Sequence, residues 1–121
     1  MFSDAVLDHF QHPRNAGEIE GANVIVQVTN PVCGDVLQLS ALIEDGTIWQ
    51  LRFLCRGCTA SIACASFLTE LVQGKKLDAL ASIAPDFLAA SLGGLPQASS
   101  HAAQLACDAL QDVIRKATAQ K

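Results

Sequence analysis

The dipeptide Asp45-Gly46, which separates two runs of alternating apolar residues, constrains the fold of this chain more than any other feature. An Asp-Gly pair in such a position is a strong signal for a tight hairpin, because both residues tolerate the backbone that the turn requires. Residues 36–43 and 47–55 are therefore predicted to pair as antiparallel strands. The apolar positions in phase are Leu37, Leu39, Ala41 and Ile43 before the turn, and Trp49, Leu51 and Phe53 after it.

A third alternating run, residues 23–29, precedes the hairpin and predicts another strand. Its valines would lie on one face and its polar residues on the other. Three sequential strands with short connections make an antiparallel sheet, and its apolar face must be covered by other elements. The valines are Val24, Val26 and Val28, and the polar residues are Asn23, Gln27 and Thr29.

Helical patterns on both sides of the strands supply this cover. Ser3 can cap a short helix that Pro13 ends. After the strands, a helix that is apolar on nearly all sides runs to about Gln73, with Thr59 or Ser61 as its cap. The apolar stripe of the first helix is predicted to be Val6, Leu7 and Phe10.

Two short helices, 77–83 and 86–92, and a long last helix complete the predicted order α-β-β-β-α-α-α-α. Ser99 or Ser100 would cap the last helix, whose apolar stripe faces the core. The fold class is thus α+β, a three-stranded antiparallel sheet covered by helices. A length of 121 residues favours one domain, 1–121.

Composition narrows the functional classes. With 50% hydrophobic and 17% charged residues, the chain is neither a disordered tail nor a charged linker. No apolar run approaches the roughly 18 residues of a membrane span, and the first residues do not resemble a signal peptide, so a cytoplasmic location is expected. A net charge of −4 without a basic cluster argues against nucleic acid as a partner. Five cysteines without an export signal suggest ligands, reactive thiols or buried packing rather than disulfides.

Cys33-Gly34-Asp35 places a thiol and a carboxylate around a glycine, directly before a predicted strand. Both side chains coordinate metals, and the glycine allows the backbone to turn both toward one ion. The pair alone is a weak signal, since a buried thiol beside a turn-forming aspartate has the same sequence.

Two further residues extend this pair into a candidate metal site. Cys58 lies between a strand end and a helix start, where the helix dipole and Arg56 favour a thiolate, although it could be a structural loop cysteine. His101 lies in the first turn of the last helix, where a capping or surface role is the alternative. Two thiolates, a carboxylate and an imidazole suit zinc or iron, so Cys33, Asp35, Cys58 and His101 form the candidate ligand set.

The remaining cysteines and histidines are assigned to the structure rather than to chemistry. Cys55 and Cys64 occupy core positions of a strand and a helix. Cys55 and Cys58 make a Cys-x-x-Cys, but no second pair follows, which speaks against a zinc ribbon. His9 and His12 are interpreted as structural or partner-contacting residues.

Taken together, several motifs resemble the IscU-type scaffolds of iron–sulfur cluster assembly, a family that also includes the N-terminal domain of NifU. The resemblance covers nearly the whole chain. Its motifs are Asp8-His9-Phe10 with Pro13-Arg14-Asn15, the loop Asn30-Pro31-Val32-Cys33-Gly34-Asp35, Phe53 with Gly57-Cys58, Gly74-Lys75-Lys76-Leu77-Asp78, and Leu95-Pro96 before a helix that opens with a histidine.

The resemblance implies a carrier rather than an enzyme with turnover. Such a scaffold receives sulfur from a cysteine desulfurase, takes up iron, builds a [2Fe-2S] cluster and passes it to apo acceptor proteins. Zinc is an alternative occupant of the same site. The ligand positions of the family fall on Cys33, Asp35, Cys58 and His101.

The chain departs from the family pattern at Ala102, where the family has a third cysteine that serves as a ligand and as a persulfide acceptor. Cys107 is a poor substitute, because it lies roughly 240° around the helix and about 9 Å along it from His101. The segment Leu95-Pro96-Gln97-Ala98-Ser99 also lacks the family's chaperone-binding motif, so dependence on a dedicated chaperone is unsupported.

Ala102 leaves two alternatives open. The first is a degenerate zinc-binding homologue that docks on a desulfurase or another partner without building clusters. The second is a sulfur-relay protein that carries persulfide sulfur on Cys58.

Overall fold

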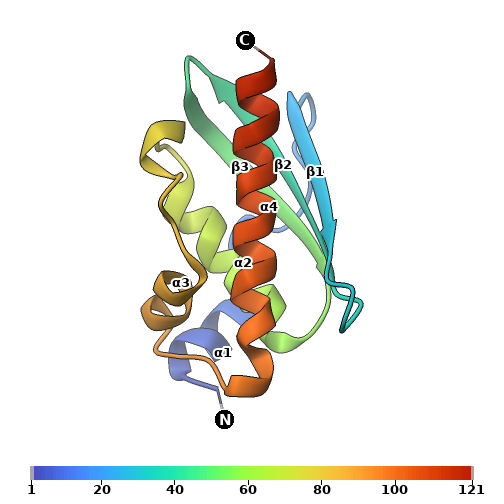
Figure 1. The fold of residues 1–121 in the computed structure, drawn as a ribbon, viewed down its shortest axis with the longest axis vertical. Helices are drawn as coiled ribbons and strands as arrows, with labels where there is room; N and C mark the ends of the chain where they lie inside the picture. The colour runs from blue at the N-terminus through green and yellow to red at the C-terminus, as the bar shows by residue number, and fades with distance from the viewer. Residues whose placement is uncertain (1, 121) are drawn as a thin grey trace.

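A computed structural model describes residues 2–120. Its strands form one three-stranded sheet, and Figure 1 shows helices packed across one face of this sheet. This arrangement confirms the predicted α+β class and order of elements, except that a single 3₁₀ turn replaces the helix expected over 77–83. The elements are α1 Asp4–Gln11, β1 Val24–Thr29, β2 Val36–Glu44, β3 Thr47–Arg56, α2 Thr59–Val72, the 3₁₀ turn Leu77–Ala79, α3 Pro85–Ser91, the 3₁₀ turn Gln97–Ser99 and α4 Ser100–Ala119.

The sheet is an antiparallel meander in the order β1-β2-β3. Glu44 pairs with Thr47 across a turn in which Asp45 has φ 53° and Gly46 has φ 73°. Positive φ at both central residues is the geometry that a two-residue hairpin loop needs. The hairpin prediction is confirmed, and it brings Val36, at the start of β2, opposite Arg56 at the end of β3.

The predicted phase of β3 is wrong at Trp49. The register shifts between Leu42 and Ile43, so Leu42 pairs with Gln50 whereas Ile43 pairs with Ile48. The extra residue in β3 turns Trp49 outward, and it is 55% exposed, while Ile48 takes the buried position. Simple alternation cannot detect a bulge of this kind, because the bulge resets the period-2 pattern inside the strand.

The predicted stripe of α1 is only partly correct. Val6 is buried, but Leu7 and Phe10 are exposed, and His9 occupies the inner face instead. The His9 ring is satisfied there, since Nδ1 lies 2.8 Å from the Ser66 hydroxyl and the ring packs edge-on against Phe67. A partner on α2 thus allows a polar residue to take a core position.

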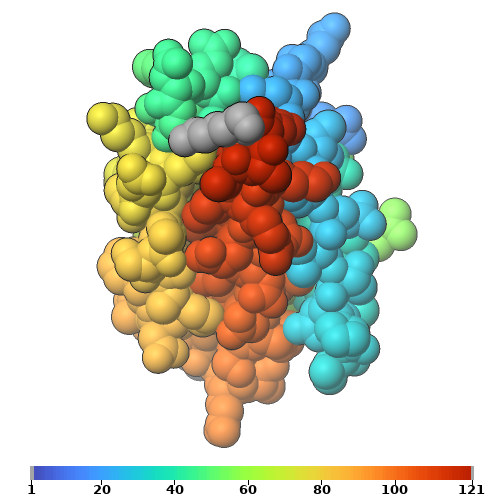
Figure 2. All heavy atoms as spheres, turned by 45° about the horizontal axis from the view of Figure 1, so that its top comes forward, coloured from blue at the N-terminus to red at the C-terminus, as the bar shows by residue number. Residues whose placement is uncertain are grey.

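Helices α2 and α4 pack against the sheet and against each other. The N-cap residue of α2 is Cys58, not Thr59 or Ser61, while Ser99 caps α4 as expected, without a side-chain hydrogen bond. Figure 2 shows α4 lying lengthwise on the surface between β1 and the segment that follows α2. Within residues 2–120, no helix combines the length and the apolarity of a membrane span.

Candidate metal centre

The predicted ligands come from three separate segments that meet at one end of the sheet. Cys33 and Asp35 lie on the loop between β1 and β2, Cys58 precedes α2, and His101 lies in the first turn of α4. The pairing of Val36 with Arg56 places the residue before β2 beside the residues after β3. The meander itself therefore brings Asp35 next to Cys58.

The loop before β2 is shaped by Asn30. Its side-chain oxygen accepts the N–H of Val32 at 2.9 Å, and its backbone exchanges hydrogen bonds with Gly34 and Asp35, each at 2.8 Å. Gly34 has φ +78°, a conformation that a residue with a Cβ rarely adopts. As a result Cys33 is exposed at the tip, while the Asp35 side chain turns inward and is only 11% exposed.

Asp35 is held by the start of α2. Ser61 donates its hydroxyl hydrogen to Oδ2 at 2.5 Å, and the backbone N–H of Cys58 points to the same oxygen at 3.4 Å. Burial alone would raise the pKa of this carboxyl, but the hydrogen bonds from Ser61 and Cys58 outweigh burial, so the pKa lies below its ordinary value. The carboxylate is accordingly an anion at neutral pH, which is the form that binds a metal.

His101 completes the cluster from the side of α4. Its Nε2 lies 3.7 Å from Oδ2 of Asp35 and 4.0 Å from Sγ of Cys58. Ligand atoms of Cys33, Asp35 and His101 all lie within 4.8 Å of one another. Cys58 falls outside that group of three but adjoins it through His101, so the structure brings all four predicted residues together. Their role as ligands stays a prediction.

The donor set suits a soft or borderline metal. Thiolates and imidazole favour zinc and iron, and a carboxylate adds a harder oxygen donor. All four residues lie on a loop or at a helix start. Cys33 and Cys58 are exposed, so a metal can be reached from solvent. The arrangement can bind a metal without enclosing it.

The other cysteines have a different environment. Burial raises the pKa of Cys64 to about 12 and that of Cys107 to about 11, so both remain protonated thiols. Cys55 is half-buried at the end of β3, and burial, together with the nearby Asp35 and Cys58, raises its pKa to about 12. Cys107 is thus a core residue rather than a replacement for a cysteine at position 102.

Two residues that support Asp35 were missed as such by the sequence analysis. Ser61 was considered only as a possible helix cap, and Gly57 only as part of the Gly57-Cys58 motif. A Cβ at Gly57 would lie 2.8 Å from Cγ of Asp35, so this position must lack a side chain for Asp35 to pack as it does. A serine in the first turn after a candidate ligand is the one signal that could have indicated the contact.

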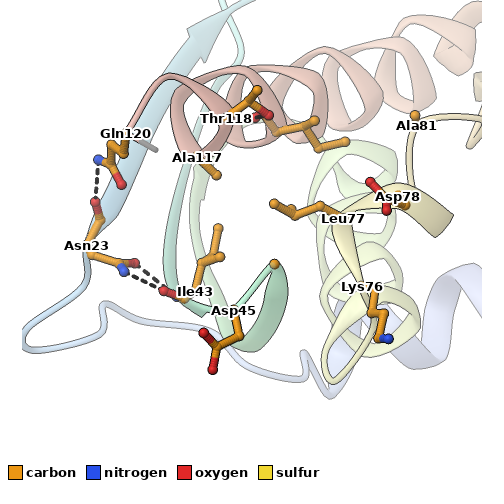
Figure 3. A pocket seen from close by; sticks show the side chains of 12 residues that line it. Asn23, Ile43, Asp45, Lys76, Leu77, Asp78, Ala81, Ala117, Thr118 and Gln120 are labelled. Carbon is orange, nitrogen blue, oxygen red and sulfur yellow. Dashed lines mark hydrogen bonds between the residues drawn. The ribbon is translucent and has the colours of Figure 1, made fainter.

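An open hollow of about 780 Å³ lies at the opposite end of the sheet, between the β2–β3 turn and the last turn of α4. Figure 3 shows Asn23 closing one side through hydrogen bonds to the backbone of Ile43, with Gln120 bonded in turn to the Asn23 carbonyl. Asp45, Lys76 and Asp78 also line it. These groups do not form a cluster of possible metal ligands. The candidate site is therefore the end of the sheet that carries the Cys33–Asp35 loop.

The chain is similar to known proteins over nearly its whole length. A profile of the NifU-like N-terminal domain family matches residues 1–121. The iron–sulfur cluster assembly scaffold protein IscU 1 of Archaeoglobus fulgidus is 44% identical over 114 residues, covering 94% of this chain and 74% of that protein. IscU of Aquifex aeolicus is 36% identical over 116 residues, with the same two coverages. The solved structure of the N-terminal part of a nitrogen-fixing NifU-like protein from Brucella abortus has a TM-score of 0.81 at 18% identity, covering 98% of this chain and 95% of that one, which supports the fold alone.

Proposed function

The chain belongs to the NifU-like N-terminal domain family, and from that premise we propose that it is a scaffold on which an iron–sulfur cluster is assembled and from which it is passed on. One observation carries the proposal: donor atoms of Cys33, Asp35 and His101 converge within 4.8 Å, with Cys58 adjoining them. The named relatives IscU of Archaeoglobus fulgidus and Aquifex aeolicus support the same role. The protein then acts as a carrier and not as an enzyme with turnover.

In this role the cluster, a [2Fe-2S] unit, is cargo. Thiolates of Cys33 and Cys58 would hold the iron, and His101 and Asp35 would complete the ligand shell. Zinc would occupy the same donors in the absence of iron and sulfide. Exposure of the two thiols favours both loading and release, because no element has to open.

Asp35 is proposed to keep the cargo releasable. A carboxylate oxygen is a harder donor than a thiolate and binds a soft cluster less firmly. Replacing Asp35 with alanine should therefore lengthen the lifetime of the bound cluster, measured as the decay of its visible absorbance. A variant that loses its cluster sooner than the parent would contradict this role.

Sulfur delivery is proposed to use Cys58, because Ala102 provides no third thiol beside His101. The Cys58 thiolate would attack the terminal sulfur of a desulfurase persulfide, forming a new S–S bond and releasing the desulfurase cysteine as a thiolate. The carrier then holds one additional sulfur atom. Incubation with a cysteine desulfurase and cysteine should add about 32 Da to Cys58 by mass spectrometry, the mass of one sulfur atom.

The implied partners are a cysteine desulfurase and apo acceptor proteins, and a dedicated chaperone is not part of the proposal. A cytoplasmic location and a single domain over 1–121 stay predictions of the same kind. Neither nucleic acid nor a membrane is expected as a partner.

Anaerobic reconstitution with ferrous iron and sulfide tests the proposal. We expect visible charge-transfer absorbance together with protein-bound iron and sulfide. The degenerate zinc-binding homologue, which Ala102 favours, predicts a different outcome: no absorbance develops while one zinc per chain remains bound. That result would overturn the scaffold role.

A further inference from the structure

Ser61 has a buried hydroxyl, and within residues 2–120 both of its hydrogen-bond partners are candidate ligands. It lies in the first turn of α2 and is 2% exposed. It donates to Oδ2 of Asp35 at 2.5 Å, and its oxygen lies 3.4 Å from Sγ of Cys58. A buried hydroxyl needs a partner, and here the partner is the carboxylate.

The missing side chain of Gly57 leaves room for the Asp35 carboxylate. The carboxylate occupies the space that a side chain at position 57 would fill, 2.8 Å from Cγ and 2.9 Å from Oδ2. Within that room, Oδ2 accepts hydrogen bonds from the Ser61 hydroxyl and from the backbone N–H of Cys58. Nε2 of His101 lies 3.7 Å from the same Oδ2, so the histidine faces the oxygen that these hydrogen bonds hold.

We propose that Ser61 is a positioning residue, which orients the Asp35 carboxylate toward the bound metal. This inference rests on the proposed function, since it assigns Asp35 a place in the metal site. It concerns the affinity for a single divalent ion, whereas the release role proposed for Asp35 concerns the lifetime of an assembled cluster. A ligand carboxylate that is itself hydrogen-bonded is held in its binding orientation, and loss of such a partner typically lowers metal affinity about 10- to 100-fold. Ser61 does not touch the metal; it acts through Asp35.

A purely structural role for Ser61 makes a different prediction. If the hydroxyl only completes the start of α2, its removal would lower stability and leave the metal site of the folded protein unchanged. If it acts through Cys58, its removal would weaken the site whether or not Asp35 is present. Asp35 substitutions therefore separate the three possibilities.

The test uses Co²⁺ alone as the probe, because thiolate-to-cobalt absorption reports binding without any cluster. Six proteins are titrated: wild type, Ser61→Ala, Ser61→Thr, Asp35→Ala, the double variant Ser61→Ala with Asp35→Ala, and Ser66→Ala. Ser66→Ala is the matched control, since this serine lies on the same helix, is fully buried, and bonds to His9 and the backbone of Arg14 instead. Circular dichroism confirms that each variant is folded.

We expect Ser61→Ala to lower Co²⁺ affinity by about 10-fold or more, and Ser66→Ala to leave it unchanged. In the Asp35→Ala background, Ser61→Ala should have no further effect. The hydroxyl of Ser61→Thr should restore most of the affinity and the wild-type cobalt spectrum.

The proposal is overturned if Ser61→Ala binds Co²⁺ as wild type does, if Ser66→Ala weakens binding equally, or if Ser61→Ala still weakens binding without Asp35. These outcomes are independent of cluster assembly. A wild-type protein that builds no cluster but shows this coupling would refute the proposed function and retain the role of Ser61. A protein that builds clusters but lacks this coupling would support the proposed function and refute the role of Ser61.

Discussion

In both α2 and α4, the start of the helix differs from its buried middle. Each has a candidate ligand at its start, Cys58 or His101, and a buried cysteine roughly 9 Å further along its axis, Cys64 or Cys107. The starts of both helices meet the Cys33–Asp35 loop, whereas the two cysteines lie in the core cluster. The helix starts and the buried middle of these helices both contain cysteine. Only the helix starts lie beside the other candidate metal ligands.

The difference shows that position, not residue type, determines the chemistry of a thiol. Cys58 is exposed and has hydrogen-bonding neighbours in Ser61 and His101. Cys64 is fully buried among apolar side chains, and burial raises its pKa to about 12. A count of cysteines therefore overstates the number of ligands that this chain can offer.

The largest expected difference between the regions is in alkylation rate. Because the pKa of Cys64 is raised from an ordinary 9.0 to about 12, its thiolate at pH 8 is about 1000-fold scarcer than that of an ordinary thiol. Mass-resolved iodoacetamide labelling should modify Cys33 and Cys58 first and leave Cys64 and Cys107 unmodified until the protein unfolds. Equal labelling of Cys58 and Cys64 in the folded protein would remove the distinction.

A second test concerns His9, the buried histidine of α1, which lies outside the candidate site. Burial lowers the pKa of His9, and Arg14 lowers it further, against the opposing effects of Glu70 and Asp8. A depressed folded pKa means that the unfolded chain binds the proton first, so stability should fall as the pH drops below about 6.5, by at most about 1.4 kcal/mol per pH unit.

Urea unfolding of wild type and His9→Gln between pH 7.5 and pH 5 measures this effect. The variant should be less stable at neutral pH but show a flatter pH profile over this window. Parallel profiles for the two proteins would show that another group carries the pH dependence.

The smallest effect concerns stability. Cys64→Ala removes a buried sulfur and should cost about 1 kcal/mol of unfolding free energy, as for loss of one methylene-sized group. Cys58→Ala, at an exposed position, should change it by less than about 0.5 kcal/mol. Chemical denaturation of the metal-free proteins checks both values, and a larger cost at Cys58 than at Cys64 would contradict the division into site and core.

Most of the fold could be predicted because local signals agreed with each other. The Asp45-Gly46 turn and the period-2 runs specify the meander, and the alternation of β2 and β1 is as expected. The failures have tertiary causes. The bulge at Trp49 depends on strand register, and the burial of His9 depends on a serine that lies far away in the sequence.

The residues of the candidate site were likewise predicted only in part. Cys33, Asp35, Cys58 and His101 were identified by residue type, position and family resemblance, and the structure brings them together. Ser61 and Gly57 escaped notice because their importance lies in contacts with Asp35 across the sheet end. Whether Cys107 could replace a cysteine at position 102 likewise depended on the packing of α4, which buries it.

Metal and sulfide analysis of protein purified without oxygen tests the central claim most directly, with Cys33→Ala and Cys64→Ala as the matched pair. The account predicts bound iron with sulfide, or zinc in their absence, in wild type and Cys64→Ala, and its loss in Cys33→Ala. A wild-type protein that holds neither iron nor zinc, or equal metal content in the two variants, would contradict it.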